Sequence, residues 1–110
     1  MARWWDAIST DKVRGHGLTP ALCDQVLDNP EAVAVFAYPN PDDGWPREAL
    51  AALTAVGWVV VVFEMRPDAS DPTVEDWQVV VTGYKAGATV IEELGRRDRD
   101  RRNRRDREGR

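Results

Sequence analysis

Near the N-terminus, capping residues followed by glycines predict one short helix, and apolar positions at helical spacing predict a second. The second is the better marked: Thr19 is a good N-cap, Pro20 suits the first helical position, and Asn29 precedes a proline that ends the helix. Its apolar stripe consists of Leu22, Cys23, Val26 and Leu27. The first helix is expected to begin at Ser9 or Thr10 and to end at the glycines that follow.

Further along the chain, apolar residues alternate or run together as they do in strands. The segments expected to form strands are 32–38, 49–55, 58–66 and 76–86, with 3–7 as a short strand or packed arm. Residues 47–57 alone would score as a helix on their alanines and leucines. A hairpin turn at Val56-Gly57 leads directly into 58–66, however, and this favours a strand over 49–55.

A last helix is expected from residue 88, with an apolar side made of Val90, Ile91 and Leu94. The whole order predicts an α+β domain of two layers, in which two N-terminal helices pack on one face of an antiparallel β-meander and a C-terminal helix follows. The length of 110 residues fits one domain. We place it at residues 1–95 and treat 96–110 as a charged tail.

Alternation along the strands separates two faces of the expected sheet. The face toward the helices should carry Val59, Val61, Phe63, Met65, Trp77, Val79 and Val81. The second face should carry Trp58, Val60, Val62, Glu64, Arg66, Gln78, Val80, Thr82 and Tyr84. Two interpretations of this second face stay open: an ordinary solvated surface, or a concave polar platform for a ligand.

The charge is split between an acidic body and a basic tail. Nine of the fifteen basic residues lie in 96–110, whereas residues 1–95 carry a net charge of about −9. Acid-first pairs four residues apart, such as Glu92 with Arg96, neutralise part of the tail and would support a helix there. The tail is therefore either a solvated charged helix or coil, or an arm for RNA or an acidic partner.

The sequence argues against several kinds of protein. The N-terminus lacks the apolar stretch of a signal peptide, and the longest apolar run, 58–63, is too short to span a membrane. We expect a cytoplasmic protein with no membrane partner. With one cysteine, Cys23, and one histidine, His16, we expect no metal site and no cofactor.

Four segments resemble, in the same order, the BrnT-like branch of the RelE superfamily of bacterial toxins. They are DKVRGHGLTPALCDQVL, a turn-rich stretch, ALTAVGWVVVVFEM and WQVVVTGYKA, and together they span about residues 5–90. The resemblance implies a RelE-like α+β fold and a metal-independent ribonuclease. It also implies a type II toxin–antitoxin system, in which an antitoxin protein encoded beside the toxin silences it.

The family motifs map onto this chain in part. His16-Gly17 fits the HG pair with Gly15 in place of a basic residue, and Arg47 stands where a basic residue precedes the first hairpin strand. Gly57 matches the glycine of a "GR" pair whose arginine is replaced by Trp58. The segment 82–85, Thr-Gly-Tyr-Lys, fits the last-strand motif.

Three hypotheses follow. In the leading one, the chain is a toxin-like endoribonuclease: Arg47 and Arg66 clamp phosphate, and Tyr84 or His16 transfers protons or stacks. Substrate-binding residues would then be Lys12, Trp45, Thr82 and Lys85. The second is a RelE-fold interaction module without catalysis, and the third is a plain RNA-binding module resting on the tail and the tryptophans. The sequence leaves the oligomeric state open.

Overall fold

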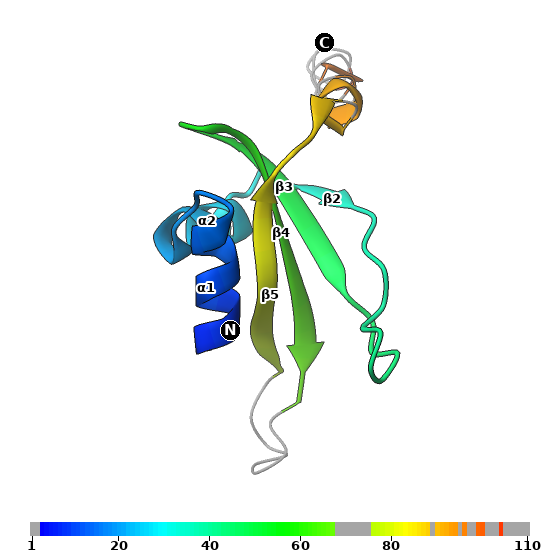
Figure 1. The fold of residues 1–110 in the computed structure, drawn as a ribbon. Coiled ribbons are helices and arrows are strands. Elements are labelled where there is room, and N and C mark those ends of the chain that lie inside the picture. The colour runs from blue at the N-terminus through cyan, green and yellow to red at the C-terminus, as the bar shows by residue number, and fades with distance from the viewer. Residues whose placement is uncertain are drawn as a thin grey trace.

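The computed structural model describes residues 3–67, 76–88, 90–94, 96, 99, 100 and 104. It is an α+β fold with one five-stranded sheet in the order β1-β5-β4-β3-β2 (Figure 1). The elements are β1 (Arg3–Trp4), α1 (Ala7–Gly15), α2 (Pro20–Asp28), β2 (Val33–Val35), β3 (Glu48–Thr54), β4 (Gly57–Arg66) and β5 (Trp77–Lys85). Residues 88 and 90–94 are also helical.

Both N-terminal helices form as expected, with one correction to the first. Thr19 caps α2 by accepting from the backbone N–H of Leu22, as predicted. The predicted start of α1 at Ser9 or Thr10 is wrong, because Asp6 is the N-cap. Its carboxylate accepts from the Ser9 backbone N–H at 2.7 Å, and the Ser9 hydroxyl bonds back to the Asp6 backbone as a capping box.

The sheet is a meander with one parallel strand added. The pairs β2–β3, β3–β4 and β4–β5 are antiparallel, whereas β1 runs parallel to β5 with Arg3 opposite Gln78. The strand expected over 49–55 is confirmed as β3, and its hairpin turns at Gly57, whose φ of 100° suits glycine. The strand expected over 32–38 is too long, since β2 ends at Val35 and the chain leaves the sheet there.

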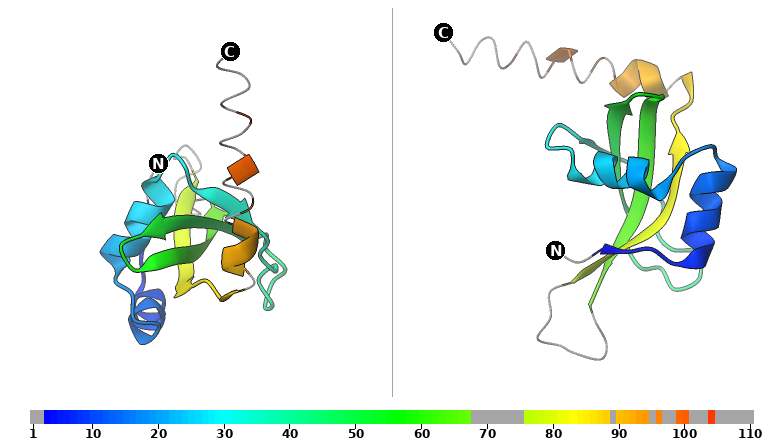
Figure 2. Two further views of the ribbon diagram at one scale, coloured as in Figure 1. Left: turned by 90° about the horizontal axis from the view of Figure 1, so that it is seen from above. Right: turned by 90° about the vertical axis from the view of Figure 1, so that its left-hand side faces the viewer.

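Helices α1 and α2 cover one face of the sheet, hereafter the helix face (Figure 2). The core between them contains Val13, Leu18, Cys23, Val26, Ala52, Val59, Val61 and Val80, all of which are buried. Close approach is possible because β5 carries Gly83 at this layer. A Cβ on Gly83 would lie 2.8 Å from the sulfur of Cys23, so α2 could not pack this closely on any larger residue.

A β-bulge corrects the predicted faces of β5. Val62 lies opposite Thr82, but its neighbour Phe63 lies opposite Val80, so Val81 is the extra residue. The bulge shifts the alternation by one residue. Trp77 and Val79 therefore lie on the second face opposite Arg66 and Glu64, and Gln78 and Val80 lie on the helix face. Thr82 and Tyr84 lie on the second face as expected.

The second face has its own apolar cluster and is not an ordinary solvated surface. Ala49, Ala51 and Val60 are buried there beneath Leu94, which is 1% exposed and comes from the C-terminal helical segment. Val90 and Ile91, expected on the same apolar side, remain 38% and 41% exposed. This segment thus covers one end of the second face and leaves the rest open.

The predicted boundary at residue 95 stays a prediction. Most of the segment 96–110 lies outside the described residues, and its described members, 96, 99, 100 and 104, are helical. Among the described residues, no helix is long and apolar enough to cross a membrane.

Candidate functional site: a groove on the second sheet face

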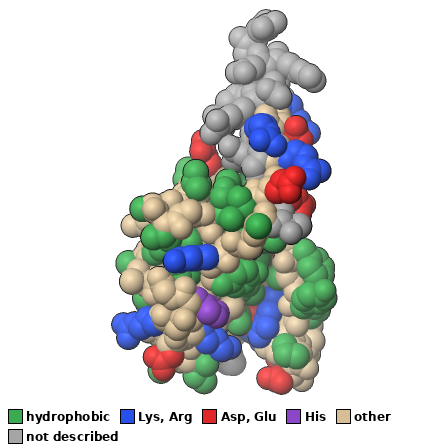
Figure 3. All heavy atoms as spheres, turned by 45° about the horizontal axis from the view of Figure 1, so that its top comes forward, with side chains coloured by type: hydrophobic (Ala, Val, Ile, Leu, Met, Phe, Trp, Pro, Cys, Tyr) green, Lys and Arg blue, Asp and Glu red, His purple; other side chains and the backbone are tan. Residues whose placement is uncertain are grey.

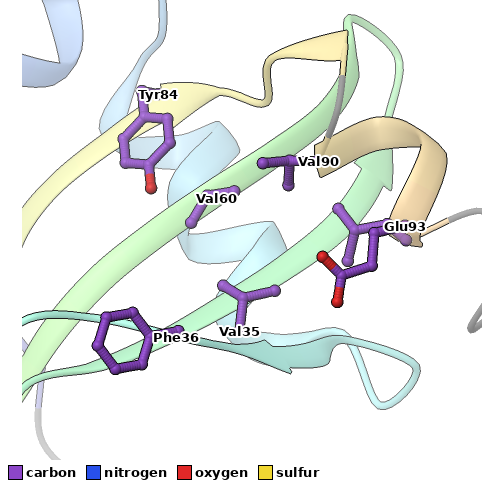
Figure 4. Close-up of a pocket in the computed structure, with 7 residues that line it drawn as sticks. Val35, Phe36, Val60, Tyr84, Val90 and Glu93 are labelled. Carbon is purple, nitrogen blue, oxygen red and sulfur yellow. The ribbon is translucent and has the colours of Figure 1, made fainter.

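Two adjoining hollows form a groove along the open part of the second face. One, of about 180 Å³, lies against the C-terminal helical segment, and the other, of about 280 Å³, extends toward Arg47. Both are lined by Phe36 and Tyr84, so they lie side by side. Figure 4 shows Tyr84 of β5 and Val60 of β4 across from Phe36, with Val90 and Glu93 closing one end.

One rim of the groove is aromatic because the chain leaves the sheet after Val35. Phe36 and Tyr38 pack edge to face with ring centroids 4.9 Å apart. They nevertheless remain 76% and 79% exposed, which is unusual for large apolar side chains. Their predicted assignment to a strand is the reason that sequence reasoning missed them. The run AVAVFAY gives no signal that pairing stops at its second valine, Val35.

At the far end, a buried carboxylate gathers two candidate catalytic cations. Glu64, which is 5% exposed, accepts from Arg47 Nε at 2.9 Å and from Arg66 Nε at 2.7 Å. Asn40 adds an amide donor at 3.1 Å. Arg66 also pairs with Asp43 at 2.9 Å. The structure therefore brings Arg47 and Arg66 together, but through an acid that the sequence hypotheses gave no role.

The electrostatics of this cluster favour ionised groups. Burial raises the pKa of Glu64, but hydrogen bonds from Arg47 and Arg66 more than offset this, and the net pKa is lowered. The pKa of Asp43 is lowered by the backbone N–H of Trp45 and then by Arg66. In turn, the Asp43 carboxylate raises the pKa of Arg66. Two guanidiniums and two carboxylates thus balance one another.

Trp45, a predicted substrate-binding residue, belongs to this cluster. Its ring lies under the Arg66 guanidinium, 4.3 Å from the carbon Cζ to the ring centroid, and its indole N–H donates to the carbonyl of Met65 at 3.1 Å. These contacts fix the loop before β3 onto the end of β4. Trp45 is therefore engaged in contacts within the protein that hold this loop in place.

Thr82 and Arg47 bring unused hydrogen-bonding capacity to the groove. The hydroxyl of Thr82 is buried and has no partner among the described residues, and the residue lines the groove from the second face, where it lies opposite Val62. Within the same part of the chain, Arg47 is paired through Nε only, which leaves the terminal N–H groups of its guanidinium. Arg47, Thr82 and Tyr84 therefore line one hollow, as three of the predicted site residues.

The remaining predicted site residues lie elsewhere. His16 Nδ1 lies 2.8 Å from the carbonyl oxygen of Gly83, and because a carbonyl only accepts, Nδ1 carries the proton. Lys85 pairs across the sheet with Val59, on the helix face, and its ammonium approaches Gly17. Lys12 is exposed in the last turn of α1, where a cation suits the helix dipole. In Figure 3, the histidine lies at the surface with basic side chains on the same side.

The described residues contain no group of three or more His, Cys, Asp or Glu side chains placed to hold a metal ion. Cys23 is enclosed in the helix-face core, and burial raises the pKa of its thiol to about 11. It is accordingly a core residue and not a nucleophile.

Comparison with known proteins adds little to this geometry. No family model matches the chain. It is similar to human paraneoplastic antigen-like protein 8B, with 34% identity over 74 residues. The match covers 64% of this chain and 11% of that protein, so the chain spans about a tenth of the length of this relative.

Proposed function

We propose that this chain is a RelE-like protein-interaction module without catalysis, and that its groove binds a segment of a protein partner, the antitoxin-like product of a neighbouring gene. The observation that carries the proposal is the exposed aromatic rim, Phe36 and Tyr38, above an apolar floor. A few anchor residues supply most of the energy at protein interfaces, and tyrosine is among the types enriched there. An exposed apolar surface beside polar groups is typical of such sites.

Charge specifies the partner further. The body carries a net charge of about −9, and the two arginines beside the groove are balanced by Glu64 and Asp43. Complementarity therefore favours a segment with apolar residues for the groove and basic residues on its flanks. Leu94 gives a precedent within the chain, since a helical segment already covers the same face by burying this leucine against Val60.

The test is complex formation with the purified product of the adjacent gene, measured by calorimetry. Phe36→Ala and Tyr38→Ala should each weaken binding by about tenfold or more, as expected for anchor residues. Ile8→Ala is the matched control, because Ile8 is 69% exposed but lies on α1, away from the groove. The absence of a complex, or equal losses in all three variants, would refute the proposal.

A ribonuclease of the toxin type is the second candidate. It is favoured by one observation: Arg47, Thr82 and Tyr84 line the same hollow and keep unused hydrogen-bonding groups. Expression of the chain without its neighbouring gene should then arrest growth, and Tyr84→Ala should relieve the arrest. Harmless expression of the unaltered chain would sink this candidate.

A further inference from the structure

Glu64 is placed unlike the other acids of the described chain. It is a carboxylate near the end of β4, on the sheet face that carries the groove, is 5% exposed, and uses both of its oxygens. Oε1 faces Arg66, and Oε2 receives Arg47 and Asn40. A buried carboxylate is costly unless it is paired in this way, so the two arginines are needed where they are.

The same contacts limit what the arginines can do for a ligand. Each guanidinium has given its Nε–H to Glu64, and Arg66 is further enclosed by Asp43 and the ring of Trp45. The terminal N–H groups of Arg47 remain unpaired within the described part of the chain, but two carboxylates balance the two guanidiniums, so a phosphate would meet no net positive charge there. A phosphate that drew either arginine away would leave the buried Glu64 with only one of its two counter-charges. The acidic body adds long-range repulsion against any polyanion.

We propose that Glu64 is the specificity-determining residue of the groove: by holding Arg47 and Arg66, it closes the groove to polyanions and reserves it for a protein segment. This inference rests on the protein-binding function proposed above and names what sets its ligand preference. Glu64 thus acts as a charge lock: its ion pairs hold the two guanidiniums in place and neutralise the positive charge that would otherwise attract phosphate.

The test compares Glu64→Gln with Glu48→Gln in the full-length chain, using a fluorescent single-stranded polyuridine oligonucleotide as the polyanion. Glu48 is exposed on the neighbouring strand, opposite Phe63 on the helix face, so its substitution removes the same charge without touching the arginines. The basic tail is present in both variants and contributes equally.

Glu64→Gln should bind polyuridine about tenfold more tightly than Glu48→Gln. Its salt dependence should be steeper by about one phosphate contact, because Arg47 becomes available whereas Arg66 stays paired with Asp43. Arg47→Gln in the Glu64→Gln background should remove most of that steepening. Equal affinities for the two single variants would overturn the proposal.

Circular dichroism establishes whether Glu64→Gln folds. If it does not fold, a second variant tests the proposal. Arg47→Gln in the otherwise unaltered chain should leave polyuridine affinity within about twofold, since a locked arginine contributes little to phosphate binding. A loss of fivefold or more would overturn the proposal. Failure of the antitoxin complex would refute the proposed function without altering this comparison, so the two failures are distinguishable.

Discussion

At the residue scale, the sharpest steric constraint is at Gly83. This glycine gives the helix layer room, because a Cβ there would meet the Cys23 sulfur at 2.8 Å and a methyl of Val13 at 3.4 Å. Both neighbours are fully buried and have little freedom to move away.

Gly83→Ala should therefore lower the free energy of unfolding by about 1–3 kcal/mol through overpacking, measured by urea denaturation. Gly15→Ala is the control. A Cβ at Gly15 meets nothing within 4 Å, and Gly15 is the last residue of α1, where alanine favours the helix more than glycine does. Combining Gly83→Ala with Cys23→Ala should recover part of the loss. If the double variant had the same free energy of unfolding as Gly83→Ala alone, contact with the Cys23 sulfur would not be the cause of the loss.

Single residues also mark the limit of what the sequence could predict about the site. Arg47, Thr82 and Tyr84 were identified as site residues, and they line one hollow. Glu64 was placed on the correct face. Its hydrogen bond from Arg47 was not predicted, because the two residues are 17 apart in the chain. Periodicity assigns a side chain to a face and says nothing of which charges meet there. Phe36 and Tyr38 were missed for a similar reason, since apolar composition alone does not reveal where strand pairing stops.

At the scale of elements, the fold was predicted where local pattern and tertiary structure agree. The strand over 49–55 was recovered against its helical composition, because a hairpin turn fixes both of its strands at once. The bulge at Val81 escaped prediction, and with it the faces of Trp77 through Val80 were reversed. A bulge depends on the partner strand, so strict alternation within one strand cannot reveal it.

The start of α1 gives a prediction at this scale. Asp6→Ala should destabilise the protein by about 1 kcal/mol, because the Ser9 backbone N–H would lose its acceptor and the capping box would be broken. Asp6→Asn should retain most of the stability, since an amide oxygen also caps. Asp11→Ala, an exposed change within the same helix, is the control in thermal denaturation. If Asp6→Ala and Asp11→Ala had the same melting temperature, the cap would make no contribution to stability.

At the scale of the whole molecule, the distribution of charge matters more than its total. The net formal charge of −4 conceals a body near −9, and within that body ion pairs join Arg3, Arg47 and Arg66 to acids from other segments of the chain. Arg3 joins β1 to α2 through Asp24 and Asp28, and Arg66 joins β4 to the loop before β3 through Asp43. The first set joins the edge strand β1 to the helix layer, and the second joins the end of the central strand β4 to the loop before β3.

Acid should therefore destabilise the folded state. The pKa of Asp28 is lowered by its hydrogen bond from Arg3, and those of Asp6, Asp43 and Glu64 are lowered as well. A carboxylate with a lower pKa in the folded state binds protons more readily once the chain unfolds, so stability is present above the ordinary carboxyl pKa values and is lost as pH falls below them. The free energy of unfolding from urea titrations should be nearly constant between about pH 7 and 5 and should fall steeply below about pH 4.

Asp28→Asn should flatten that fall, whereas Asp11→Asn, which alters an exposed acid on α1, should leave it unchanged. Equal stability at pH 7 and pH 3 would contradict the ionised state of these pairs, and with it the balance of charge that keeps Arg47 and Arg66 in place beside the groove.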